Sequence, residues 1–300
     1  MRVHTIDLEF QGLPGVIASY LIEGDGGVFL VETGPESTRR VLESKLKDLG
    51  YTPADLDAVF VTHIHLDHAG AAGAFAAVGV PVYVHPKGSK HLIDPTRLIE
   101  SARMVYGEEF DELWGEMTPA PAANVHEMRD GEIVEIAGIP VQAIETPGHA
   151  FHHHAYLVGA NAVFAGDAAG ARLEGAAYTS VTSAPPQFHL EHSLASIDKI
   201  VKINSLDLYL THFGKVDEPV GHLSDYLDAV ELNAIFVLQR IEEGMGVDAL
   251  KIAYQAFQME QAFRAGLPRE SWARYQAVNG TDMCADGIRL YWEKKASEGA

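Results

Sequence analysis

The sequence predicts an α+β fold built as layers of helix, sheet, sheet and helix. Its first two thirds hold short apolar runs separated by turns rich in glycine, which are typical of strands. A helical pattern follows each block of strands, and from residue 190 onward the pattern is mostly helical. Blocks of strands that are each followed by helices indicate this layered arrangement.

The first block begins with a predicted hairpin. Ala18–Glu23 and Val28–Glu32 are apolar runs on either side of a glycine-rich turn. Glu36–Leu49 then has helical spacing with an apolar face, and Gly50 ends it. Two further strands are expected at Leu56–Thr62 and Val80–His85, with a helix of small residues between them at Ala69–Val78.

Residues from about 88 to 118 carry aromatic and charged side chains at helical spacing, which predicts a helical insertion. Strands are then expected at Glu132–Ile136, Pro140–Glu145, Ala155–Val158 and Ala162–Ala165. The late helices are expected at Glu191–Lys202, Val220–Glu243, Val247–Ala265, Arg269–Ala277 and Asp286–Lys295. We therefore predict one domain that holds the strands at 1–218 and a helical C-terminal extension at 219–300. The extension is expected to cover an edge, shape a pocket or form a homodimer.

The composition narrows the choice of partners. The formal net charge is -20, and such a surface repels nucleic-acid phosphates and anionic membranes. We therefore expect a small-molecule substrate, with neither a nucleic acid nor a membrane as partner. Cys284 is the single cysteine, so no disulfide forms within the chain. The N-terminus does not resemble a signal peptide and no apolar run reaches about eighteen residues, so a cytoplasmic location is expected.

The strongest functional signal is a cluster of histidines and one aspartate directly after a predicted strand. His63, His65, Asp67 and His68 fall within six consecutive residues. Histidine offers a ring nitrogen to a metal such as zinc. Alternation aims His63 and His65 to one side of an extended chain, while Asp67 and His68 face a second position. Four such groups are costly to bury without partners, and a bound metal removes that cost.

Three further candidates each close an apolar strand. They are His149, Asp167 and His212, at the ends of segments 145–149, 163–167 and 208–212. Polar residues that gather where strands end in loops, over a rigid scaffold, are typical of a functional site.

This ordered set resembles the signature of the metallo-β-lactamase superfamily, with the glyoxalase II-like branch as the expected relative. The signature is His-x-His-x-Asp-His followed by His, Asp and His at later strand ends, and the resemblance covers roughly residues 1–215. It implies a four-layer αββα sandwich with the metals between loops at one edge. It also implies a dinuclear centre with three ligands for each metal and one bridging aspartate: His63, His65 and His149; Asp67, His68 and His212; and Asp167.

The resemblance further implies metal-dependent hydrolysis. A hydroxide that bridges two divalent metal ions would be the nucleophile, and Asp67, the expected catalytic residue, would orient it and help to move protons. The metals would polarise the scissile bond and stabilise negative charge in the transition state. Zinc is the first expectation, and the mixed nitrogen and oxygen ligands also suit iron or manganese.

The chain departs from the family pattern at one position. The early strand usually ends in Asp-x-Gly, whereas glutamate, Glu32, stands here in the first position. That aspartate normally supports a ligand histidine from outside the ligand set, and we expect Glu32 to keep this role. His153 lies four positions after His149, where relatives often carry a histidine that orients a ligand or contacts substrate. His152 and His154 are expected to face solvent or the core.

The leading hypothesis for the reaction is hydrolysis of a small ester-like substrate, a thioester or a lactone. The glutathione-binding pattern of a true glyoxalase II is not evident, and Gly170 replaces the tyrosine of acyl-homoserine lactonases. An iron-dependent sulfur dioxygenase is one alternative, although the segment after Asp167 lacks that branch's Gly-Arg-Thr-Asp-Phe pattern. A phosphodiesterase is another. The intact ligand set argues against a non-catalytic module.

Overall fold

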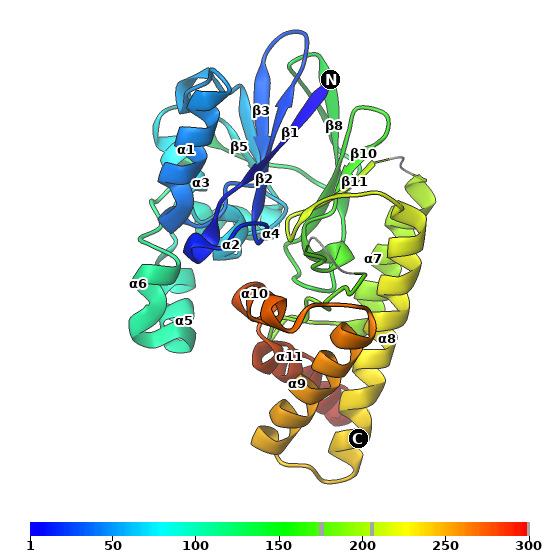
Figure 1. Ribbon diagram of the computed structural model, residues 1–300. Coiled ribbons are helices and arrows are strands. Elements are labelled where there is room, and N and C mark those ends of the chain that lie inside the picture. The colour runs from blue at the N-terminus through cyan, green and yellow to red at the C-terminus, as the bar shows by residue number, and fades with distance from the viewer. Residues whose placement is uncertain (174–176, 205–206, 299–300) are drawn as a thin grey trace. The chain divides into compact units, whose positions relative to one another are not determined.

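The computed structural model describes residues 1–173, 177–204 and 207–298, which fall into two compact units. Unit 1 comprises Met1–Glu145 and His152–Ala165, and unit 2 comprises Thr146–Phe151 and the described residues from Gly166 onward. Each unit has its own strands and helices (Figure 1). The expected division of the chain between residues 218 and 219 stays a prediction.

The first sheet of unit 1 has six strands in chain order, with helices in the connections. Its elements are β1 (Arg2–Asp7), β2 (Ala18–Glu23), β3 (Val28–Val31), α1 (Arg39–Asp48), β4 (Ala58–Phe60), α2 (Leu66–Ala69), α3 (Ala72–Ala77), β5 (Val82–Val84), α4 (Pro86–Ile93), α5 (Thr96–Tyr106), α6 (Phe110–Leu113) and β6 (Val125–Glu127). The strands β1 to β3 are antiparallel, and β3 to β6 run parallel. Parallel neighbours need long crossovers, which the helices after β3, β4 and β5 supply.

Burial explains why these segments were predictable. All four residues of β3 and all three of β4 are buried, as parallel strands covered on both faces require. Leu42 and Leu46 lie four residues apart on α1 and are both buried, so they share the face toward the core. Figure 1 shows α1 and α3 beside this sheet. The predicted hairpin, the first helix and the helical insertion are therefore confirmed.

The predicted helix at Ala69–Val78 is instead two short helices, α2 and α3. The backbone N–H of Ala71 donates to the carbonyl of Gly34 at 3.0 Å, outside the helix. Gly70 also lies so close to Pro35 that a Cβ would come within 2.9 Å of the proline Cα. The break therefore results from packing of this turn against the loop after β3.

The second sheet of unit 1 is an antiparallel meander. Its strands are β7 (Ile133–Ile136), β8 (Ile139–Glu145), β9 (His154–Val158) and β10 (Ala162–Phe164), as predicted. It packs on the first sheet through aromatic rings, with centroids 5.3 Å apart for Phe60 and Tyr156 and 5.1 Å apart for Tyr20 and Phe164. The Tyr156 hydroxyl donates to the Val61 carbonyl at 3.0 Å, so its polar end is satisfied inside this core.

Unit 2 is mostly helical. Its elements are the 3-10 helix η6 (Gly166–Ala169), α7 (Leu190–Ile203), the antiparallel pair β11 (Asp207–Leu210) and β12 (Gly214–Val216), α8 (Pro219–Glu242), α9 (Val247–Arg264), α10 (Trp272–Val278) and α11 (Thr281–Glu298). The long helix α8 contacts α7, α9 and α11 (Figure 1). The five predicted helices are confirmed, although α11 begins five residues before the expected Asp286, at a Thr-Asp start signal.

The sequence also predicts a short strand at Leu206–Leu210; Leu206 lies outside the described residues, and the rest is β11. Strands β1, β6 and β12 lie outside the predicted elements. β1 and β6 are the two edges of the first sheet, and their side chains are only partly buried. Edge strands carry fewer apolar residues, so their sequence signal is weak. Across the residues that the structure describes, no helix has the length and apolar character needed to cross a membrane.

Candidate metal centre

The parallel strands β3 and β4 of unit 1 place the predicted motif at their carboxyl ends. Val31 pairs with Phe60, so the residues that follow β3 and β4 lie beside each other. Glu32 follows β3, and the motif at residues 62–68 follows β4 and continues into α2. The carboxyl ends of parallel strands are the common place for a ligand site in open sheets.

Glu32 is buried and its carboxylate accepts hydrogen bonds from Thr62 and His68. The donors are Thr62 N at 3.2 Å, Thr62 Oγ1 at 2.5 Å and His68 Nδ1 at 2.9 Å. The backbone of Glu32 has a φ of 66°, which costs a residue other than glycine of order 1 kcal/mol. Its N–H donates to Phe60 and its carbonyl accepts from the Ser19 hydroxyl, so the conformation is held on both sides. Glu32 therefore lies where it supports His68 directly.

The bonds around Glu32 also decide which nitrogens of His63 and His68 carry protons. The Thr62 hydroxyl gives its one proton to the carboxylate, so it accepts from His63 Nδ1, 3.1 Å away. His68 Nδ1 carries a proton because its partner is a carboxylate oxygen. In the neutral rings the lone pair then lies on Nε2 of each histidine, as metal ligation requires.

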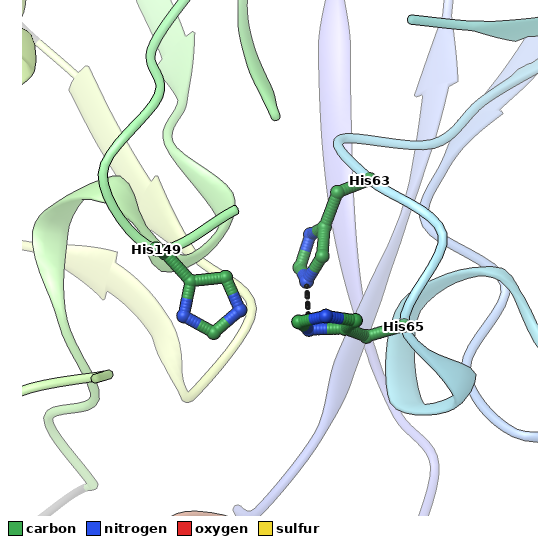
Figure 2. A group of neighbouring side chains, drawn as sticks. All are labelled: His63, His65 and His149. Atoms are coloured by element: carbon green, nitrogen blue, oxygen red, sulfur yellow. Dashed lines mark hydrogen bonds between the residues drawn. The ribbon is translucent and has the colours of Figure 1, made fainter. Parts of the chain in front are cut away.

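The donor atoms of the motif form two pairs within unit 1. His63 Nε2 accepts a hydrogen bond from His65 Nδ1 at 2.9 Å, which the dashed line in Figure 2 marks. His68 Nε2 lies 3.5 Å from Asp67 Oδ2. In this second pair a nitrogen lone pair faces a carboxylate oxygen. Two acceptors at this distance repel each other, and a bound cation would remove that repulsion.

The three later candidates meet at Asp167 in unit 2. His149 lies on the loop between β8 and β9, Asp167 in η6, and His212 in the turn between β11 and β12. His149 Nε2 is 3.2 Å from Asp167 Oδ2, and His212 Nε2 is 3.5 Å from Asp167 Oδ1. All three residues are buried. One carboxylate therefore presents a different oxygen to each of two histidines.

The proton on His149 is also fixed by its surroundings. His149 Nδ1 lies 2.9 Å from the carbonyl oxygen of Thr182, which can only accept, so Nδ1 is the donor. The lone pair on Nε2 then faces Asp167, where a bound cation would remove the repulsion between the two acceptors. Gly148, with a φ of 137°, allows the loop to touch α7, because a Cβ there would lie 2.4 Å from the Ser193 hydroxyl oxygen. These contacts fit the residues to a metal ion.

The three consecutive histidines that precede and open β9 are all buried. The His153 ring centroid is 4.9 Å from that of His63, and the His152 centroid is 6.1 Å from it. His154 packs instead on His85, with 4.5 Å between centroids. His153 therefore contacts a predicted ligand, and His152, which was expected to face solvent or the core, lies near the same ligand.

Residues that the sequence did not indicate complete the surroundings of the candidate ligands. Thr62 donates a hydrogen bond to Glu32, and Thr182 accepts one from the proposed ligand His149. Tyr226 bonds the Thr182 hydroxyl, and His222 bonds Ala169, two residues after Asp167. Thr62 had a usable signal, since it directly precedes the motif. The other contacts join residues far apart in the chain, which no local pattern reveals.

About the first two thirds of the chain match one protein family. A model described as Metallo-beta-lactamase superfamily matches residues 12–212. The chain belongs to the metallo-β-lactamase superfamily. Most members of this superfamily are metal-dependent hydrolases, and the described residues of this member include groups of histidine and aspartate side chains that could hold metal ions. Each residue of those groups is one of the seven predicted ligands.

Individual relatives agree with this assignment. The metallo-beta-lactamase fold-containing protein ST1585 of Sulfurisphaera tokodaii is 25% identical over 236 residues, 77% of this chain and 86% of that protein. The crystal structure of ST1585 matches with a TM-score of 0.64 at 26% identity, over 76% of this chain and 85% of that one. The family protein TTHA1429 of Thermus thermophilus has a TM-score of 0.67 at 22% identity, over 99% of this chain and 94% of that one.

These comparisons confirm the predicted fold. The chain has the α+β metallo-β-lactamase sandwich with a helical C-terminal extension. The likeness to TTHA1429 covers nearly the entire chain, so the C-terminal helices belong to a fold that another member also has.

Proposed function

We propose that this protein is a dinuclear metal-dependent hydrolase of a small ester-like substrate, a thioester or a lactone. Zinc is the proposed metal, with iron and manganese as alternatives. The proposed ligands are His63, His65 and His149 for one ion, Asp67, His68 and His212 for the other, and Asp167 as the bridge.

One observation carries the proposal, and it recurs in each unit separately. A histidine Nε2 that bears a lone pair faces a carboxylate oxygen, from His68 to Asp67 in unit 1 and from His149 to Asp167 in unit 2. The candidate ligand atoms also fall into two sets within each unit. The motif in unit 1 forms two pairs, and in unit 2 Asp167 offers one oxygen to His149 and the other to His212. This division supports two cations rather than one.

The chain's own residues have distinct tasks in this proposal. Bound divalent ions would supply Lewis acidity and activate a water molecule. The Asp67 side chain is 18% exposed, against 6% for Asp167, so it is the carboxylate that water reaches more easily. Asp67 would orient that water and help to move its proton. Glu32 holds His68, and through Thr62 also His63, in the tautomer that places the lone pair on Nε2.

A small molecule is the proposed substrate class. The formal net charge of -20 supports it over a nucleic acid or an anionic membrane, which such a surface repels. The helical insertion at α4 to α6 presents apolar and charged side chains together, which supports an organic ester over a highly charged polymer.

A substrate panel tests the proposal. The purified chain is loaded with zinc, iron(II) or manganese(II), its metal content is measured, and each form is assayed on thioesters, lactones and phosphodiesters with oxygen uptake recorded. We expect two metal ions per chain and turnover of a thioester or a lactone. Asp67→Asn should abolish this turnover while the circular dichroism spectrum stays unchanged. Turnover of phosphodiesters alone, or oxygen consumption with one iron per chain, would reject the proposal.

A further inference from the structure

Thr182 touches two of the proposed ligands through two different groups. Its carbonyl oxygen accepts from His149 Nδ1 at 2.9 Å, and its hydroxyl donates to the backbone carbonyl of Asp167 at 2.7 Å. Thr182 is buried, so water does not compete for either bond. The carbonyl fixes the tautomer of His149, and the hydroxyl fixes the backbone that carries Asp167.

Tyr226, on α8, completes the hydrogen bonding of Thr182. The two hydroxyl oxygens are 3.1 Å apart, and Tyr226 is the donor because Thr182 has already given away its one proton. The Tyr226 ring also lies against Gly170, where a Cβ would come within 2.4 Å of a ring carbon. One turn earlier on α8, His222 Nε2 donates to the carbonyl of Ala169 at 2.8 Å. One face of α8 therefore holds the segment that follows Asp167.

The residue that caps α10 and a residue on α11 hold the two neighbours of Thr182. Asn279 Nδ2 donates to the Val181 carbonyl at 2.9 Å, and the Ser183 hydroxyl donates to the Cys284 carbonyl at 3.0 Å. Cys284 Sγ lies 2.9 Å from Asn279 Oδ1, which links the two anchors. A shift of Thr182 would therefore break buried hydrogen bonds on either side of it.

We propose that Thr182 is a positioning residue through which the C-terminal helices hold His149 and Asp167 ready to bind metal. The helices α8, α10 and α11 lie outside residues 12–212, the part that matches the family model. The inference rests on the proposed metal centre and gives these helices a task in it. It implies that removing one hydroxyl, which contacts no metal, weakens metal binding.

Three variants test the hydroxyl contacts. Thr182→Val keeps the shape and the carbonyl but loses the hydroxyl, and Thr182→Ser keeps both polar groups. Zinc dissociation constants are measured by competition with a chromophoric chelator. We expect Thr182→Val to raise them roughly 10- to 100-fold, the range for partners that support metal ligands, and Thr182→Ser to bind as the wild type does. Tyr226→Phe, one bond further away, should raise them less, by roughly 3- to 10-fold.

Thr281→Val is the matched control. Thr281 is 2% exposed, against 3% for Thr182, and its hydroxyl bonds Gln276 Oε1 at 2.9 Å rather than any support of a ligand. We expect this variant to lower the unfolding temperature without changing zinc affinity. The absorption spectrum of the cobalt(II) form reports ligand geometry, so it should change in Thr182→Val and stay the same in Thr281→Val.

Two results would overturn the inference alone. Thr182→Val could bind zinc as tightly as the wild type, or Thr281→Val could weaken binding as much as Thr182→Val does. A wild-type protein that takes up no metal would overturn the proposed metal centre together with this inference. The two failures are therefore distinguished by the wild-type measurement.

Discussion

The two units hold their candidate ligands by different means. In unit 1, four candidates follow one strand and a buried carboxylate, Glu32, accepts hydrogen bonds from their surroundings. In unit 2, three candidates come from three segments, and His149 and Asp167 are held by the neutral groups of Thr182, backed by Tyr226. A bond to a charged group contributes about twice as much as a neutral one, so unit 2 needs more contacts for the same rigidity.

This difference follows from how the chain reaches each set of ligands. A motif within six residues shares one strand and one turn, so a single support orients several side chains. Ligands on separate loops each need their own anchors, and α7, α8 and the last helices provide them in unit 2. Among residues that support the ligands, substitutions in unit 1 should therefore act through one charged group, and those in unit 2 through several neutral ones.

The largest effect is expected where one carboxylate serves two histidines. Asp167→Asn keeps the shape of the side chain but removes the charge that faces His149 and His212. Loss of several kcal/mol of transition-state stabilisation corresponds to on the order of 10³-fold lower kcat/KM. We also expect at least one metal ion per chain to be lost on dialysis, measured by elemental analysis. Asp198→Asn, an exposed position on α7, is the control and should change neither quantity.

The two units also differ in how much of their structure could be predicted from the sequence. The strands β2, β3 and β4 and the motif at residues 62–68 were predictable because apolar runs and histidine spacing are local signals. The contacts of Thr182 were not, since they join residues 33 and 44 positions apart, and a threonine among other threonines and serines has no distinctive pattern. The break between α2 and α3 was also hidden, because it depends on the loop after β3.

Glu32 tests the charged support of unit 1. In Glu32→Gln, an amide NH₂ would face donors that now bond a carboxylate oxygen, so we expect zinc affinity to fall roughly 10- to 100-fold. The free energy of unfolding of the metal-free protein should fall by about 1.5 to 3 kcal/mol, measured with urea in chelator. Glu32→Asp keeps the charge on a shorter side chain. Its zinc affinity and free energy of unfolding should lie between those of the wild type and those of Glu32→Gln. Unchanged zinc affinity in Glu32→Gln would remove the contrast between the units.

The neutral support of unit 2 should weaken in acid. Burial lowers the pKa of His222 to about 4, whereas a histidine in the unfolded chain titrates near about 6.5. Between these values the unfolded chain binds a proton that the folded protein does not, so stability falls as the pH falls through this range. At pH 5 the loss is roughly 2 kcal/mol, at about 1.36 kcal/mol for each pH unit below 6.5.

His222→Gln isolates this contribution. Its amide can still donate to the Ala169 carbonyl but takes up no proton. Urea unfolding of the metal-free protein at pH 7 and pH 5 should show a smaller loss of stability in the variant than in the wild type. Equal losses in both proteins would mean that His222 does not contribute to the acid sensitivity of unit 2.

The smallest effect is expected from ion pairs at the surface of either unit. On α1, Arg39 pairs with Glu36 and Glu43, both at 2.6 Å, and on α11 Arg289 pairs with Glu293 at 2.7 Å. Solvent and salt screen such pairs, so Arg39→Met and Arg289→Met should each lower the free energy of unfolding by about 0.5 kcal/mol. Neither should change zinc affinity. A change as large as that in Glu32→Gln would mean that surface charge, rather than the buried supports, holds the ligands.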